Sequence, residues 1–232
     1  MTALADPAAS ERDAELPKSG AKKPAGKREL VQTRAEETRE RILDAAYEAF
    51  AKQGFEGANT RAIAATADTT HAAIRYHFGT KEELWREVVR RMYDEVAEEA
   101  ELTLVSDTTG KSPTELLRRY LRSYARYSAA NVNHALITIS ESVTGGERLE
   151  WMSETFIRPR HEMALSHLEK YREAGLLQDI PPVTLLYIIV SVCQMPFVLS
   201  QQMKVLYGVD MMDESAIDAH IDAILKIFVP ED

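Results

Sequence analysis

A short segment beginning at His71 groups small, polar and basic side chains of the kind that hydrogen-bond to DNA bases. If the segment is helical, Ile74 and Phe78 lie one turn apart and point into the protein. The opposite face then carries His71, Ala72, Arg75 and Tyr76. A guanidinium on such a face can donate two hydrogen bonds to O6 and N7 of guanine. This combination of an apolar inner face and a polar outer face is what a helix needs to read the major groove.

A second short helix and a polar turn are expected to position that segment. Thr60 can accept a backbone N–H as the N-cap of this earlier helix. Its apolar stripe is narrow enough for two helices to cross closely and consists of Ile63, Ala64 and Ala67. The run Asp68-Thr69-Thr70 supplies side-chain oxygens that favour a turn and a new N-cap. The spacing therefore predicts a helix-turn-helix, followed by a further helix that starts at Lys81.

A longer helix is predicted before this pair, over residues 35–53. Its buried stripe consists of Ile42, Leu43, Ala46 and Phe50. Gly54 is expected to end it, because glycine adopts the left-handed conformation of a helix C-terminus without a steric penalty.

Residues 38–85 resemble the DNA-binding head of the TetR family of tetracycline-repressor-like transcription regulators. The matching features are the A-A-x-x-x-F ending of the first helix, Gly54-Phe55, Thr60-x-x-x-Ile-Ala and Tyr76-His77-Phe78-Gly79-x-Lys81-Glu-x-Leu84. A single helix-turn-helix pattern is weak evidence, but this combination at this spacing is specific. Asp68 stands where the family commonly has glycine, and Arg75 where it often has an aromatic residue, so the operator sequence stays open.

The resemblance implies roles for individual residues. It places Thr38, Arg61 and Lys81 at positions that contact DNA in the family, with Lys81 on a phosphate. A helix N-terminus favours a phosphate, although Thr38 can equally be an ordinary first-turn residue. Arg75 has the alternative of touching phosphate alone. The candidate DNA-binding residues are Thr38, Thr60, Arg61, Thr70, His71, Ala72, Arg75, Tyr76, His77 and Lys81.

The 232 residues carry a formal net charge of −9, which is not typical of a nucleic-acid binder. Basic residues are concentrated at 18–34, where six stand against one acid, whereas most of the excess acid follows Arg86. An acidic body behind a DNA-binding face would limit nonspecific binding to the polyanion. The single cysteine, Cys193, allows no intrachain disulfide. A buried thiol in a reducing cytoplasm is favoured over a redox sensor.

Residues 1–34 have no apolar periodicity and no hydrophobic segment of signal-peptide length. We expect a disordered, partly basic tail. Its basic run at 22–28 would either lie along phosphates or in the minor groove, or remain solvated without touching DNA.

After Trp85 the chain is predicted to be helical, with no alternation long enough for a sheet. The expected helices are 81–104, 113–130, 132–143, 147–174, 182–207 and 214–228, separated by Gly and Pro signals. The predicted fold class is therefore all-α. It comprises the tail, a three-helix helix-turn-helix head at 35–80, and a helical effector-binding and dimerisation domain at 81–232.

The apolar segment 183–199 invites comparison with a membrane helix, but it has 17 residues and is interrupted by Gln194 and Pro196. A helix that is apolar all round is also typical of a buried or interface helix. The last helix adds a seam of Ile217, Ile221, Ile224 and Phe228. Both helices suit the bundle through which proteins resembling this one dimerise, so we expect a homodimer and no membrane insertion.

The resemblance also implies an effector pocket among the middle helices, whose occupancy shifts the separation of two DNA-binding heads. The apolar excess favours a hydrophobic or aromatic effector that is oriented by a few polar groups. Each candidate can instead be plain core. The candidates are Trp85, Met92, Tyr124, Tyr127, His134, Trp151, Phe156, Tyr187 and Met195.

We find no sequence motif for catalysis, a metal or a cofactor. The pairs His71/His77 and His161/His167 are six residues apart, which places each pair on different sides of a helix. The sequence favours a sequence-specific regulator that is released from a palindromic DNA operator by an effector, and the resemblance favours repression. The alternative is a helical ligand-binding or protein-interaction module that does not bind DNA.

Overall fold

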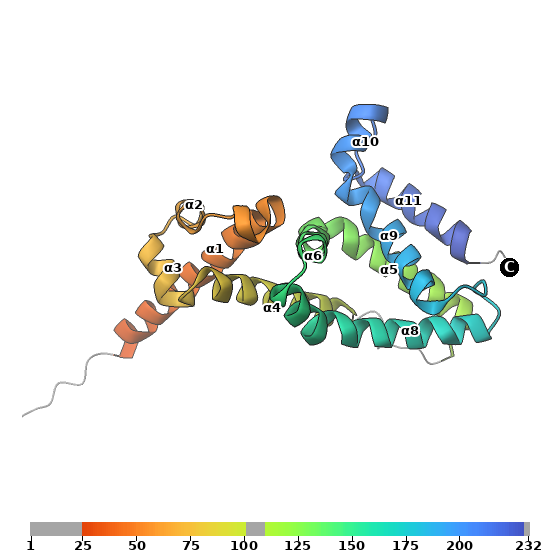
Figure 1. Cartoon of the computed structure of the whole chain (residues 1–232), viewed down its shortest axis with the longest axis horizontal. Coiled ribbons are helices and arrows are strands. Elements are labelled where there is room, and N and C mark those ends of the chain that lie inside the picture. Colours follow the sequence, from red (N-terminus) through yellow and green to blue (C-terminus); the bar gives the residue numbers. More distant parts are fainter. Residues whose placement is uncertain (1–24, 101–109, 230–232) are drawn as a thin grey trace, which may run out of the picture. The chain divides into compact units, whose positions relative to one another are not determined.

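The computed structural model describes residues 25–100 and 110–229, with side chains at 32–95 and 110–229. Every regular element in these ranges is helical, which confirms the predicted all-α class (Figure 1). The chain divides after Glu37, and every tertiary contact described below lies within the unit Thr38–Asp232.

Four helices form the N-terminal part: α1 (Ala25–Gly57), α2 (Thr60–Thr66), α3 (His71–Phe78) and α4 (Lys81–Ala100). The first of these begins at Ala25 and not near Ala35, so residues 25–34, which we expected in the tail, are helical. Most of these residues are strong helix formers, so their intrinsic propensity favours a helix. The prediction relied on apolar periodicity, which this segment lacks. The rest of the predicted tail, 1–24, lies outside the described residues.

Gly54 interrupts α1 with φ 66° and ψ 177°. The positive φ suits glycine, and the regular helix breaks at Gly54 as predicted. Its ψ lies outside the left-handed helical region, and a further helical turn follows the kink and continues to Gly57. A Cβ at Gly54 would lie 3.0 Å from the Ser140 hydroxyl. A side chain at this position would therefore also disturb the approach of α1 to α6 (Val132–Thr144).

The predicted helix-turn-helix is present, with a different cap at its start. Asn59, and not Thr60, caps α2: its side chain accepts hydrogen bonds from the backbone N–H groups of Arg61 and Ala62. Asparagine is at least as good a cap as threonine, and Thr60 becomes the first helical residue. Thr70 caps α3 as predicted, through its side-chain oxygen.

The turn between these helices contains a left-handed residue. Asp68 has φ 48°, a conformation that Asp tolerates better than most residues other than glycine. This backbone requirement explains why glycine is suitable at the same position.

A first hydrophobic core joins the N-terminal helices. Ile74 and Phe78 are 2% and 6% exposed, which confirms the predicted inner face of α3. Full burial of such a side chain contributes about 1.5–3 kcal/mol. The core also takes Trp85 from α4 and Ile137 from α6, so packing continues beyond residue 80.

The second half contains α5 (Pro113–Ala130), α6, α7 (Glu147–Met152), the π-helical turn η2 (Ser153–Ile157), α8 (Arg158–Glu173), α9 (Pro182–Val198), α10 (Ser200–Tyr207) and α11 (Glu214–Phe228). Two helices that we predicted as continuous are divided. The segment 147–174 contains η2, and 182–207 breaks at Leu199, where α9 and α10 form an angle of 63° (Figure 1).

Pro196 gives a local reason for that break. It lacks the N–H that would bond to the carbonyl of Val192. His220 of α11 donates to this carbonyl instead, from Nε2 at 2.8 Å. The end of α9 therefore lacks one hydrogen bond of its own and is tied to α11.

The apolar stripe of α11 packs in a second core with α5 and α9. Ile217 is 8% exposed, Ile221 and Ile224 are each 1% exposed, and Phe228 is half-buried. The seam that we assigned to a dimer interface is thus filled by the chain's own side chains. An amphipathic stripe does not reveal whether its partner belongs to the same chain.

Cys193 lies in the same core and is fully buried. Burial raises the pKa of its thiol to about 12, which suits a core thiol and not a reactive one.

In the part of the chain that the structure describes, no helix taken singly is long and apolar enough to cross a membrane. The bent pair of α9 and α10 reaches that length and hydrophobicity when the two are counted together.

Candidate DNA-binding face and effector region

The outer face of α3 presents the side chains predicted to meet DNA. His71, Ala72 and Arg75 are exposed, and Tyr76 is 83% exposed. Arg75 has no ion-pair partner among the described residues. This face therefore offers unpaired donors for base edges and phosphates.

A hydrogen bond joins the starts of the two helices. Thr60 Oγ1 lies 3.1 Å from Nε2 of His71, which leaves Nδ1 of the imidazole for an outside partner. Arg61 is exposed one residue further along α2. His77 is partly buried and packs edge-on against the ring of Tyr76 at 5.0 Å. The N-terminus of α2 and the outer face of α3 thus form one surface.

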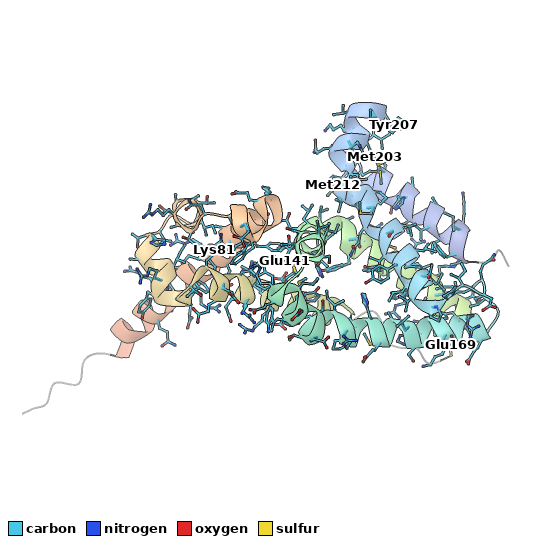
Figure 2. The ribbon with its side chains drawn as sticks, in the orientation of Figure 1. Lys81, Glu141, Glu169, Met203, Tyr207 and Met212 are labelled. Atoms are coloured by element: carbon cyan, nitrogen blue, oxygen red, sulfur yellow. The ribbon has the colours of Figure 1, made fainter. Side chains whose placement is uncertain are left out.

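Two candidate phosphate contacts are partly engaged within the chain. Lys81, at the start of α4, donates to the carbonyl of Glu56 at 3.3 Å and lies 4.7 Å from the centre of the Phe55 ring (Figure 2). Two of its three N–H donors stay available for a phosphate. Thr38 is partly exposed on α1, with its hydroxyl 3.4 Å from Nη2 of Arg41.

A polar cleft of about 440 Å³ beside α3 includes a residue that the sequence did not single out. Arg39 pairs with Glu87 of α4 and lies 5.3 Å from the centre of the Phe78 ring. The paired residues are 48 positions apart, so no local pattern could have revealed the contact.

Three of the predicted effector residues meet in a buried polar cluster. The hydroxyl of Tyr127 lies 2.6 Å from Nδ1 of His134, and Gln194 donates to the hydroxyl of Tyr124 at 3.0 Å. Burial raises the pKa of Tyr124 well above its ordinary value. Burial, together with the charge of Arg160, lowers the pKa of His134 to about 4. Tyr124 and His134 are therefore neutral near pH 7.

Phe156 joins this region through Tyr93, a residue that we did not predict. The rings of Tyr93 and Phe156 stack at 4.8 Å, and Tyr93 also meets His134 edge-on at 4.8 Å. Trp151 packs edge-on against Phe156 at 5.4 Å. Aromatic side chains from α4, α7 and η2 thus adjoin the polar cluster on α5 and α6.

The other candidates have different surroundings. Trp85 and Met92 are buried in the first core, and Met195 is partly buried on α9. Tyr187 is 55% exposed on α9 and contacts His161 edge-on at 5.7 Å. This contact does not involve the polar cluster.

A buried ion pair lies where α6 and α7 meet the end of α1. Arg148 Nε donates to Glu141 at 3.1 Å, and the two side chains are 17% and 3% exposed. The guanidinium also lies 3.8 Å from the centre of the Phe55 ring and 3.6 Å from the Glu56 carboxylate. Glu141 lies on α6 (Figure 2). Burial raises the pKa of its carboxyl group, although Arg148 opposes this shift.

Comparison with known proteins gives independent information about this architecture. Residues 42–88 match the profile for bacterial regulatory proteins of the tetR family, and residues 94–230 match the C-terminal region of YcdC-like proteins. The chain is 27% identical over 187 residues to the HTH-type transcriptional repressor NicS of Pseudomonas putida, covering 78% of this chain and 86% of NicS.

Two solved structures share the fold. HlyIIR, a hemolysin II transcriptional regulator, has a TM-score of 0.60 and 23% identity, covering 85% of this chain and 99% of HlyIIR. AibR, solved in complex with isovaleryl coenzyme A and operator DNA, has a TM-score of 0.65 and 17% identity, covering 84% of this chain and 100% of AibR.

The two family profiles follow one another along the chain, and the second alone covers more than half of it. The first falls on the helix-turn-helix whose capped turn and inner face are described above. The chain therefore belongs to the TetR family of bacterial regulatory proteins and is a DNA-binding transcriptional regulator, not an enzyme.

Proposed function

We propose that this regulator represses transcription as a homodimer on a pseudo-palindromic operator, and that a small apolar or aromatic effector releases it. The observation that carries this proposal is the outer face of α3, where Arg75 and Tyr76 are exposed while Ile74 and Phe78 hold the helix in the core. A rigid helix with unpaired donors can enter the major groove without rearrangement. NicS, which is called a repressor, supports the direction of regulation.

The proposed dimer interface is the exposed apolar face of α9. Val183 and Tyr187 are 58% and 55% exposed, and they line a groove of about 540 Å³ with Thr184, Ile188, Ser191 and Val192. Exposed apolar surface of this extent is typical of an interaction site. A second copy is the favoured partner, because two-fold symmetry lets one patch cover itself and matches two operator half-sites.

The apolar end of α10 extends this surface. Val205, Leu206 and Tyr207 are 84%, 61% and 74% exposed, and Tyr207 lies at the end of α10 (Figure 2). The base of α10 is held by polar contacts, since Lys204 pairs with Asp210 at 2.7 Å. We include this end of α10 in the proposed interface.

Arg75→Ala should relax base preference, because a bidentate contact with guanine is worth about 1–3 kcal/mol of discrimination. Lys81→Ala should instead weaken binding to all sequences alike and lower the salt slope by about one per subunit, since one fewer phosphate is neutralised. Both variants are measured on the operator, on point-mutated operators and on random duplex at several salt concentrations.

Lys52→Ala is the matched control, because Lys52 is exposed on α1 and paired with Glu48. If Arg75→Ala leaves the ranking of operator variants unchanged and lowers only the salt slope, Arg75 is a phosphate anchor. His71, Ala72 or Arg61 would then make the contacts with the bases. The wild type should bind DNA fragments recovered genome-wide more tightly than random duplex. If it does not, the proposal that it recognises a specific operator is wrong.

An effector should lower operator affinity by favouring a separation of the two heads that no longer fits two half-sites. The size of the effect is limited by the difference in its affinity for the two states. Compounds that raise the melting temperature are selected from an apolar library and tested for operator release by fluorescence anisotropy. If several bind and none changes operator affinity, constitutive repression is the better account.

A further inference from the structure

The effector region contains a positive charge without an anionic partner. Arg160 donates from Nη1 to the carbonyl of Phe156 at 3.0 Å and from Nη2 to the carbonyl of Tyr93 at 2.7 Å. Its guanidinium lies 4.9 Å from the centre of the Tyr93 ring. No carboxylate of the described residues lies within 4.0 Å of it. The two carbonyls use two of five N–H donors and leave the charge uncompensated in a partly buried place.

Two further polar groups near this charge have unused hydrogen-bonding capacity. His134 is 9% exposed, and its Nε2 has no hydrogen-bond partner in the described part of the chain, since Tyr127 takes Nδ1. Thr138 follows one turn later on α6. Its buried hydroxyl forms no well-aligned hydrogen bond in the described part of the chain, although it adjoins the Tyr93 hydroxyl and opposes the rise of the Tyr93 pKa that burial causes. Arg160 helps to lower the pKa of His134, which is consistent with their proximity. A buried hydroxyl without a good hydrogen bond lowers the stability of the folded state, so such a group is often explained by a ligand or water that binds it.

The backbone that carries these contacts is irregular. Phe156 belongs to η2, and π-helical turns inside α-helices are frequent at functional sites. The same turn presents the Phe156 ring parallel to Tyr93, with an angle of 2° between the ring planes. A stacked pair of aromatic rings thus adjoins the uncompensated charge.

We propose that this cluster binds the carboxylate of a small aromatic or aliphatic acid. Arg160 is the ion partner, His134 and Thr138 supply hydrogen-bonding groups, and Tyr93 and Phe156 contact the apolar part. A carboxylate offers acceptors alone, which matches a guanidinium with free N–H groups and a hydroxyl that forms no well-aligned hydrogen bond. A cationic ligand would be repelled by Arg160, and a neutral one would leave its charge uncompensated. The inference rests on the proposed effector-binding function and specifies the chemical class of its ligand.

Matched pairs of probes test the charge requirement: benzoate against benzamide, and octanoate against octanamide. Calorimetry on the full chain should show at least one acid binding about tenfold tighter than its amide, as a charge-assisted hydrogen bond implies. Arg160→Gln should abolish this preference. Arg158→Gln is the matched control, because Arg158 is exposed on the same helix and paired with Glu154, and it should keep the preference.

Thr138→Val provides a second test with two readouts of opposite sign. Removing a buried hydroxyl that forms no well-aligned hydrogen bond should raise the melting temperature of the free protein, whereas the affinity for the acid should fall severalfold. This variant decides the question if Arg160→Gln does not fold.

The proposal is overturned if neither acid binds at millimolar concentration, if the amides bind as tightly, or if Arg160→Gln keeps the preference. Operator release by neutral compounds, without binding of either acid, would overturn the ligand class and leave the proposed regulation intact. Acid binding that depends on Arg160 but leaves operator affinity unchanged would support the site and contradict release by this effector.

Discussion

Ile221→Glu should unfold the protein, whereas Tyr187→Glu should leave it folded but monomeric. Ile221 is 1% exposed in the core between α11, α5 and α9, so a carboxylate there would be buried without compensation, at a cost of about 3–5 kcal/mol. Tyr187 is 55% exposed in the single chain, so a carboxylate there meets water until a second copy covers it. Circular dichroism melting and sedimentation velocity separate the two outcomes.

Val143→Glu is the matched control for this contrast, because Val143 is 83% exposed on α6 and lies outside the proposed interface. It should change neither folding nor assembly. A folded, monomeric Ile221→Glu variant would return the dimer interface to the stripe of α11. A Tyr187→Glu variant that remains dimeric would move the interface away from α9.

Arg148→Met should destabilise the protein by about 3–5 kcal/mol at neutral pH, because it leaves the Glu141 carboxylate buried without its partner. The substitution retains an apolar chain next to the Phe55 ring, so the loss reports mainly on charge. Urea unfolding of the wild type and the variant measures the difference.

The same variant has a definite pH dependence. Burial already holds the folded pKa of Glu141 above the ordinary value of 4.5, and the loss of Arg148 should raise it further. A raised folded pKa means that the folded state binds the proton more tightly. The contribution of the Glu141 proton to the free energy of unfolding is therefore fully present below pH 4.5 and is lost as the pH rises through the folded pKa. The deficit of Arg148→Met should be largest at neutral pH and shrink on acidification.

Glu141→Gln in the Arg148→Met background completes the test. This double variant should recover most of the lost stability at neutral pH and show no further pH dependence at this site. A deficit of equal size at every pH, which persists in the double variant, would mean that Arg148 acts by packing on Phe55.

Local signals in the sequence predicted most of the helices and the inner face of α3. Helix α5 runs from 113 to 130 as predicted, and a capping box between Ser112 and Glu115 fixes its start. The break after Pro196 and the π turn in 153–157 were missed. In both segments, backbone carbonyls accept hydrogen bonds from side chains, as Val192 does from His220 and Phe156 does from Arg160. The packing of the helices determines which side chains can reach these carbonyls, and local sequence does not reveal it.

The candidate sites show the same limit. Periodicity placed Arg75 and Tyr76 on the exposed face of α3, because one helix determines both faces. Arg160 and Tyr93 stand 67 positions apart, and their contact requires α4 and α8 to be in place. Periodicity predicts the apolar stripe of α11, but it does not identify the partner of the stripe, which is α5 and α9 of the same chain and not a second copy.

The π turn η2 has a consequence for comparisons among relatives. A π turn closes its hydrogen bond over one residue more than an α turn, so residues after Ile157 are rotated relative to an uninterrupted helix. A relative of equal length that forms an uninterrupted α-helix here would align without a gap near 153–157. Its side chain aligned with Arg160 would then face another direction, although both sequences keep arginine. The formation or loss of this turn at constant length can therefore turn Arg160 away from the proposed acid site while the DNA-binding head stays the same.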